Sequence, residues 1–214
     1  MPKTTTFALL LWLLTVTTLV FTIVPPALGL GYLVRIMFFH IPMAWVAVLG
    51  FLLSAWWAIR YLRTKQMRYH LLSSSAARLG LIFCLLATGS GAIFAKLTWG
   101  AYWNWDPRQT TIFILLLIYG AYISLEASVE DPARRANAAA VYTLFSFITV
   151  PFLVFIIPRF FESLHPEPLI NNAGKIQMDS IMIGVLLAAL AGITGLFLWL
   201  LQYWMKRRTT KVRE

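Results

Sequence analysis

Six long apolar stretches, separated by short polar segments, organise the whole chain. They cover residues 7–24, 41–59, 79–97, 111–129, 138–157 and 180–203. Each is close to the ~20 residues that an α-helix needs to cross the ~30 Å hydrocarbon core of a bilayer. The alternating pattern of a membrane β-barrel is absent, and backbone groups in lipid must be hydrogen-bonded internally. The pattern therefore predicts an all-α integral membrane protein, with residues 1–214 forming a single domain of six transmembrane helices.

The segments between these stretches are too short to form a further domain. We expect three on one side of the membrane, at residues 25–40, 98–109 and 158–179, and two loops on the other side, at 60–78 and 130–137. Small residues at Gly89–Ser90–Gly91 would let a neighbouring helix approach closely. Pro151 predicts a kink, because proline lacks a backbone N–H and clashes with the preceding turn.

Composition and charge support this interpretation and orient the chain. Hydrophobic residues make up 60% of it and charged residues 12%, about half the charged fraction of a soluble domain, and the mean hydropathy is +0.75. Of the 18 Lys and Arg residues, five lie in or directly beside the first three segments: Arg35, Lys96, Arg108, Arg159 and Lys175. The positive-inside rule then predicts that both termini are cytoplasmic and that residues 98–109 face outward. The net charge of +10 indicates topology and attraction to anionic lipid rather than nucleic acid.

Two further features of the chain, its first thirty residues and its cysteine content, narrow the class of membrane protein. The first thirty residues faintly resemble a signal peptide, but the apolar stretch is long for one, and we expect it to be retained as the first helix. Cys84 is the only cysteine, so an intramolecular disulfide is excluded. Because no Cys-x-x-Cys-His motif occurs, the chain is not itself a c-type cytochrome.

The segment from Trp99 to Thr110 is the most informative in the chain. It holds three tryptophans, a tyrosine, Asp106 and Arg108 between two apolar stretches. Tryptophan and tyrosine collect at membrane interfaces, so an aromatic belt is one interpretation. An indole ring also needs apolar contact together with a partner for its N–H. This density beside a charged pair favours a platform for a flat, amphipathic ligand.

Two of the three histidines lie on the same side of the membrane as this segment. His40 precedes or opens the second helix, and His165 lies between the last two helices. His70 falls in the 60–78 loop on the other side, where we interpret it as a solvated loop residue. Zinc would need three or four ligands, with only Asp106, Glu162 and Glu167 as further candidates. Haem suits two histidines and an aromatic platform better, because its iron binds imidazole and its macrocycle is flat and apolar.

Several residues have two interpretations. Asp106, Pro107 and Gln109 fit the N-cap, N1 and N3 positions of a capping box, although Asp106 could instead contact the ligand. If Asp106 only caps the helix, an Asn replacement should be tolerated. Arg108 could bind a haem propionate or a lipid phosphate. Glu126 is expected to be paired, or to extend to the membrane interface, rather than to be a proton relay, and Lys96 is expected to extend to the headgroups. The remaining tryptophans are interpreted as packing residues or interfacial anchors: Trp12, Trp45, Trp56, Trp57, Trp199 and Trp204.

The pattern Trp99-Gly-x-x-Trp103-x-Trp105-Asp106-x-Arg108-x-Thr110 resembles the WWD signature of haem-handling proteins in cytochrome c assembly. The segment Arg35-Ile-Met-x-x-His40-x-Pro-x-x-Trp45 resembles the first histidine region of the haem exporter protein C family, also called cytochrome c maturation protein C. The resemblance covers nearly the whole chain. Gln109 departs from it, since an aliphatic residue would be expected there.

The resemblance implies a function and a set of site residues. His40 and His165 would be the axial ligands of haem b, carried as transient cargo. The macrocycle would be held at the outer face by Trp99, Gly100, Trp103, Trp105, Asp106 and Arg108. The protein would lie in the cytoplasmic (inner) membrane and deliver haem to a periplasmic haem chaperone, the E component. It would work with the A and B components of an ATP-binding-cassette transporter and a small single-helix D component.

The resemblance also implies that the protein is not an enzyme, because two histidine ligands leave the iron no open position. Three alternatives remain at this point. A transporter of haem or another small solute would need ionisable groups or broken helices near the membrane midplane. The chain could instead serve a different cytochrome c assembly system as its haem-handling subunit. It could also be a structural membrane subunit with a strong aromatic belt.

Overall fold

The structure is a computed structural model and describes residues 3–165 and 178–211. Its long helices are α1 (Lys3–Thr22), α2 (Met37–Thr64), α3 (Met67–Trp99), α4 (Pro107–Ser128), α5 (Pro132–Pro151) and α7 (Ser180–Lys211). Shorter elements are the 3-10 helix η1 (Tyr32–Ile36), the π-helix η2 (Phe152–Ile156) and α6 (Ile157–Phe160). Across the described residues, six helical segments are long and apolar enough to cross a membrane, and no strand occurs. The predicted all-α bundle is confirmed, while its orientation in the membrane stays a prediction.

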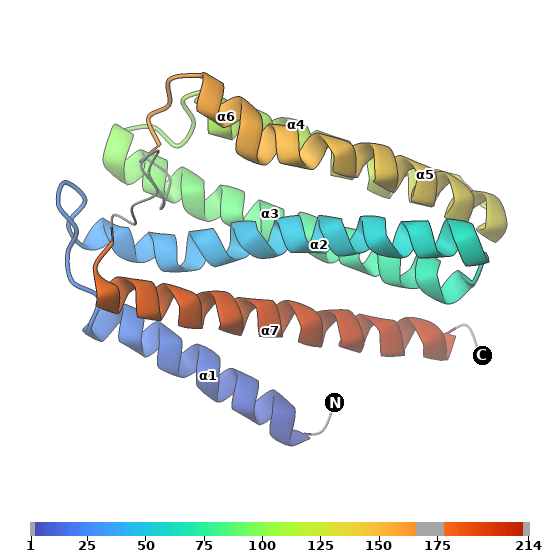
Figure 1. The fold of residues 1–214 in the computed structure, drawn as a ribbon, viewed down its shortest axis with the longest axis horizontal. Coiled ribbons are helices and arrows are strands. Elements are labelled where there is room, and N and C mark those ends of the chain that lie inside the picture. The colour runs from blue at the N-terminus through green and yellow to red at the C-terminus, as the bar shows by residue number, and fades with distance from the viewer. Residues whose placement is uncertain (1–2, 166–177, 212–214) are drawn as a thin grey trace.

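The helices run side by side, with α2 and α3 at the centre (Figure 1). On one side α4 and α5 pack against this pair, and on the other α7 packs against it and carries α1. The loop between α3 and α4, residues 99–106, is called the tryptophan loop below. It lies at the same end of the bundle as η1 and α6, here called the tryptophan end (Figure 1).

Two glycines allow the central helices to approach closely. A Cβ atom built on Gly50 of α2 would lie 2.8 Å from the Cα atom of Gly80 on α3. Small residues of this kind let membrane helices bring their backbones together. The expectation for Gly89–Gly91 is met at Gly91 only, where the close neighbour is a side chain of α2. Gly89 has nothing within 4 Å of a built Cβ, and Gly91 faces the ring of His40.

The two loops predicted at the opposite end are much shorter than expected. In place of a 60–78 loop, α2 runs to Thr64 and α3 begins at Met67, and Lys65 turns the chain with a φ of 56°. The predicted 130–137 loop is also wrong, because α5 starts at Pro132, where Asp131 accepts a hydrogen bond from the Arg134 N–H at 2.7 Å. The predicted helices ended where polar residues interrupt the apolar stretches. A helix can continue past such residues, because its backbone hydrogen bonds are made within the helix.

His70 is therefore not the solvated loop residue that the sequence predicted. It lies within α3, is buried, and places its Nε2 atom 3.7 Å from Oε1 of Glu126. The other oxygen of Glu126 accepts hydrogen bonds from Arg78 at 2.8 Å and from Ser74 at 2.9 Å. Arg208 of α7 in turn donates to the Ser74 hydroxyl. The prediction that Glu126 is paired is confirmed, and this opposite-end network joins α3, α4 and α7.

The predicted kink at Pro151 takes the form of a change in helix type. The chain leaves α5 at Pro151, forms the π-helix η2, and continues as α6 until Phe160. A π-helix fits an extra residue into a turn and often occurs at functional sites. Pro158 follows near the start of α6. Of the predicted 158–179 segment, residues 166–177 lie outside the described residues, and with them Glu167 and Lys175.

Candidate functional site

His40 lies in the first turns of α2 and is fixed by α3. Its Nδ1 atom is 2.9 Å from the carbonyl oxygen of Ala87 and 3.1 Å from the hydroxyl of Ser90. Because a carbonyl only accepts, Nδ1 carries the proton and donates, which leaves Nε2 with a free lone pair. A Cβ on Gly91 would lie 3.0 Å from Cε1 of His40, so any larger residue there would press on the ring. This arrangement orients the imidazole as in metal sites, where one nitrogen is held and the other binds.

His165 follows α6 and comes close to His40, although 125 residues separate them in the sequence. The two ring centroids are 6.5 Å apart, and the ring of Trp99 lies 5.5 Å from that of His165. Burial, helped by the nearby charge of Arg108, lowers the pKa of His165 to about 4. The imidazole is therefore neutral at neutral pH, as metal binding requires.

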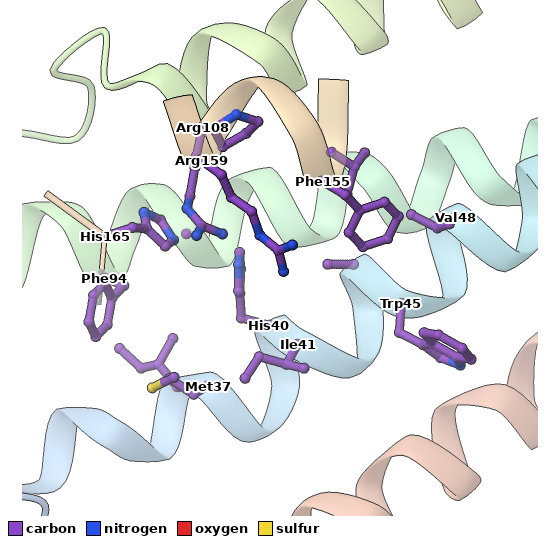
Figure 2. Close-up of a pocket in the computed structure, with 15 residues that line it drawn as sticks. Met37, His40, Ile41, Trp45, Val48, Phe94, Arg108, Phe155, Arg159 and His165 are labelled. Atoms are coloured by element: carbon purple, nitrogen blue, oxygen red, sulfur yellow. The ribbon is translucent and has the colours of Figure 1, made fainter. Parts of the chain in front are cut away.

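The two histidines line a pair of adjoining cavities of about 360 and 150 Å³ at the tryptophan end, and Figure 2 shows the residues around the larger one. Both cavities share the same central residues: His40, Ala44, Gly91, Arg108, Val154, Pro158 and His165. The larger one continues between α2 and η2, and the smaller one reaches Trp103 and the start of α4. Together they form a mostly apolar space with polar groups at one end, as is usual for small-molecule sites.

Two arginines direct their side chains into this space, Arg108 from α4 and Arg159 from α6 (Figure 2). Within residues 3–165 and 178–211 neither forms an ion pair, although the carboxylate of Asp106 is close enough to act on Arg108 electrostatically. Arg159 is exposed, whereas Arg108 is half-buried and its Nε atom is buried without a hydrogen bond. For Arg108, a partly buried cation beside an apolar cavity is costly unless an anion pairs with it. Arg159 was counted only as an outer cation in the sequence. Its position directly after an apolar stretch was the one signal for its role.

The tryptophans of the loop have separate positions. Trp103 lines the smaller cavity and meets Trp105 edge-on at 5.8 Å. Trp105 is 66% exposed and has a φ of 55°, and Trp99 packs edge-on against Phe94. Three tryptophans therefore do not make one continuous platform. Trp103 and Trp99 border the histidines, and Trp105 lies on the surface.

Gly100 ends α3 rather than lining a cavity. It has a φ of 84°, and its N–H donates to the carbonyl oxygen of Lys96. A left-handed residue at this position is a common helix C-cap, and glycine adopts it without a steric penalty. The ammonium group of Lys96 donates to the Gly100 carbonyl at 2.8 Å, so it closes the turn.

Asp106 caps α4 as predicted, and it also binds the segment that carries His165. Its Oδ1 accepts from the Arg108 N–H at 2.9 Å, and its Oδ2 accepts from the Leu164 N–H at 2.8 Å. The hydroxyl of Ser163 donates to the same carboxylate, and it accepts from the His165 N–H at 3.1 Å. The carboxylate is buried and thus joins the tryptophan loop to His165.

Gln109 does not complete the predicted capping box. Instead of reaching the Asp106 N–H, its Oε1 accepts from the Asn104 N–H at 2.7 Å, and its amide nitrogen is 3.4 Å from the Tyr102 carbonyl. The Gln109 side chain, which is buried, holds the middle of the tryptophan loop. This explains how a polar residue is accommodated at a position where an aliphatic one was expected.

The side chains at this site fit a haem iron held by two histidines better than a bare metal ion, which would need three or more side-chain ligands. Across the described ranges, no group of three or more His, Cys, Asp or Glu side chains could hold a metal ion. Sequence reasoning found both histidines, but it missed the apolar walls Ile41, Ala44, Val48 and Phe155. Hydropathy does not distinguish a cavity wall from a lipid-facing side chain. Trp45, interpreted as packing or as an anchor, also borders the larger cavity.

Comparison with known proteins identifies the family. The model of the family described as heme exporter protein C (CcmC) matches residues 1–214. Heme exporter protein C of Bradyrhizobium diazoefficiens is 33% identical over 162 residues, which are 75% of this chain and 61% of that protein. The proteins of the same name from Paracoccus denitrificans and Rhodobacter capsulatus are 30% and 28% identical, over 86% and 90% of this chain and 75% and 78% of their own lengths. The chain therefore belongs to the haem exporter protein C family, a transport component of cytochrome c biogenesis.

Proposed function

We propose that the cavities at the tryptophan end bind haem b as cargo, with His40 and His165 as the two axial ligands of the iron. The observation that carries this proposal is the spacing of the histidines. Metal–imidazole bonds are ~2 Å long, so two imidazoles on opposite sides of one metal ion have ring centroids roughly 6 Å apart. The centroids of His40 and His165 are 6.5 Å apart. The free Nε2 of His40 and the neutral ring of His165 suit the same role.

The cations in the cavity support haem over an uncharged ligand. Haem has two carboxylates at one edge, and Arg108 and Arg159 offer two guanidinium groups that form no ion pair in the described part of the chain. A guanidinium group can bind a carboxylate through two parallel hydrogen bonds. Trp103 and Trp99 would contact the macrocycle or the imidazoles, while Gly100 and Asp106 hold the loop in place. Trp105, on the surface, is placed to meet a partner protein or the membrane interface.

The cargo would be passed on without enzymatic turnover. Bound haem supplies an iron whose axial positions are both filled by histidine, so it has no open position for oxygen chemistry. We place the tryptophan end on the periplasmic side of the inner membrane, where a periplasmic haem chaperone, the E component, would receive haem. The A and B components of the transporter and the small D component would be partners in the same complex. The charge distribution and the family support this assignment.

Imidazole rescue tests the ligand assignment. His40→Gly and His165→Gly should each lose the six-coordinate, bis-imidazole absorption spectrum of the haem-loaded protein, and free imidazole should restore it. Rescue separates lost ligation from lost folding, because imidazole cannot repair a misfolded bundle. His70→Ala is a poor control, since His70 is buried beside Glu126. Unchanged spectra in both glycine variants would contradict the proposal.

The arginine assignment is tested with a haem whose carboxylates are esterified. Arg108→Gln and Arg159→Gln should each bind haem at least about tenfold more weakly, because a charge-assisted hydrogen bond contributes ~1.5–3 kcal/mol. Both variants should bind the dimethyl ester as well as the unmodified protein does. An equal loss for the two ligands would mean that the arginines act on folding and not on the carboxylates.

A further inference from the structure

The larger cavity does not end at the histidines. From His40 its lining continues along α2 through Ala44 to Val48, eight residues further on. At 1.5 Å per residue this is about 12 Å along the helix, away from the tryptophan end. On the facing side, Val154 and Phe155 of η2 complete the wall. This part of the cavity, the side arm, therefore lies at the depth of the hydrocarbon core if the helices span a membrane.

The side arm reaches the lateral surface of the bundle. Trp45 on α2 is 52% exposed and Phe155 on η2 is 47% exposed. Figure 2 shows these two side chains, from different elements, at the end of the cavity away from His165. Exposed apolar side chains within a membrane-spanning segment face lipid. The mouth of the side arm is thus a gap between two exposed aromatic side chains.

The change of helix type in the fifth span produces this gap. α5 packs against α2, whereas η2, apart from its contacts with the adjoining α5 and α6 of the same span, packs against α4. The π-turn begins directly after Pro151, and Pro158 follows near the start of α6. The fifth span therefore diverges from α2 towards the tryptophan end, and the side arm occupies the space between them.

Polarity varies along the cavity in a consistent direction. The side arm is lined by Ile41, Ala44, Trp45, Val48, Val154 and Phe155, none of which is charged. Arg108, at the start of α4, and Arg159, at the end of α6, lie at the tryptophan end. Haem dissolved in a bilayer keeps its carboxylates near the headgroups, because burying an unpaired charge is costly. Such a molecule could slide sideways between α2 and η2 and exchange headgroup contacts for the arginines without burying a free carboxylate.

We propose that the side arm is a lateral opening through which haem enters the site from the membrane. The proposal rests on the proposed function, because it supplies the route to the same two histidines. The occupant is a flat, apolar macrocycle with carboxylates at one edge. The continuity of the arm with His40 and the two arginines favours this occupant over a lipid chain or a helix of another subunit.

Site-directed labelling of the arm tests the route. Cys84 is fully buried, so a cysteine introduced at the surface can be labelled selectively with a bulky maleimide such as pyrene maleimide. Val48→Cys places the label in the arm, and Phe155→Cys places it at the mouth. Leu52→Cys is the matched control: it is 46% exposed, one turn further along α2, and outside the cavity lining. The full-length protein is reconstituted in vesicles whose bilayer already contains haem, and loading is followed by the bis-imidazole spectrum.

Labelling Val48→Cys or Phe155→Cys before loading should slow loading by about tenfold or more, because a block acts on the association rate. Labelling after loading should leave the spectrum unchanged, and labelled Leu52→Cys should load at the unlabelled rate. Equal loading rates with and without label at both arm positions would overturn the route. So would displacement of bound haem by the label, which would make the arm part of the binding site.

Two further outcomes separate the remaining possibilities. If labelling the side arm leaves loading unchanged but prevents association with another subunit, the side arm is a docking surface and the proposed entry route for haem is wrong. If the unlabelled protein never shows the bis-imidazole spectrum, the proposed function itself fails, independently of the labels.

Discussion

The carboxylate of Asp106 accepts hydrogen bonds from two segments of the chain that lie far apart in the sequence. One oxygen accepts from the backbone of Arg108 in α4, and the other from the backbone of Leu164, 58 residues later. Ser163 donates to both oxygens. Helix capping alone would need one acceptor, whereas joining the two segments needs two. Because both oxygens of Asp106 are used, a substitution at this position should do more than remove a helix cap.

We expect Asp106→Asn to lose haem nearly as readily as Asp106→Ala. An amide has one acceptor oxygen, so its nitrogen would face a backbone or hydroxyl donor, and an unsatisfied buried group costs ~1–3 kcal/mol. The sequence alone predicted that Asn would be tolerated. The measurement is haem occupancy after purification. Asp131→Asn is the matched control, because Asp131 is exposed and caps α5 through a single backbone N–H. If Asp106→Asn retains as much haem as this control, the cap-only interpretation is restored.

Residue chemistry predicted the polar half of the candidate site but not its walls. The choice of His40 and His165 followed from their shared side of the membrane, and the structure brings them together. The capping role of Asp106 followed from a local pattern and is confirmed. His70 was misplaced because its neighbours are polar, and hydropathy does not detect a helix that continues past the apolar stretch. Arg159 was passed over because a cation after an apolar stretch also suits a headgroup contact.

At the scale of the helices, α3 determines how His40 is held. Gly91 makes room for the imidazole ring, and the carbonyl of Ala87, one turn earlier, fixes its Nδ1 atom. The sequence predicted that a neighbouring helix approaches closely near Gly91, but not that the group in contact is the imidazole ring of His40 on α2. A glycine pattern indicates that space is needed and not what fills it. The same limit applies to Pro151, which predicted a disturbance but not that the chain would form a π-turn.

A pair of glycine substitutions on α3 tests whether Gly91 constrains the ring of His40. Gly91→Ala should shift the ring of His40 and alter the haem spectrum, because a Cβ there would lie 3.0 Å from Cε1. Gly89→Ala has nothing within 4 Å of the new Cβ and should leave the spectrum unchanged while stabilising the helix by ~1 kcal/mol. Absorption spectra and thermal unfolding of the two variants give the comparison. Identical spectra for both would show that Gly91 does not constrain His40.

At the scale of the whole molecule, the two ends of the bundle do different work. The tryptophan end holds the cavity, and the opposite end holds the network of Glu126, His70, Ser74, Arg78 and Arg208. Three helices meet in this network, although none of its residues lines a cavity described here. We interpret it as a structural clamp that sets the positions of α3, α4 and α7.

Breaking the clamp should destabilise the protein without changing haem ligation. Arg78→Gln would leave the buried carboxylate of Glu126 without its closest cation, which should cost ~3 kcal/mol. Arg60→Gln is the control, since Arg60 is exposed near the same end and its guanidinium group contacts the ring and hydroxyl of Tyr69. Thermal unfolding should distinguish the two variants, while haem bound to each should keep the same spectrum. A changed spectrum in Arg78→Gln would show that the network acts on the haem site.

The identity of the two iron ligands in the unmodified protein tests the central claim most directly. Electron paramagnetic resonance and near-infrared magnetic circular dichroism of the ferric, haem-loaded protein distinguish axial ligand pairs. The account predicts a low-spin iron with two imidazole ligands, His40 and His165. A five-coordinate, high-spin iron would contradict it. A histidine–thioether signal would also contradict it, and it would point to Met37, which lines the same cavity.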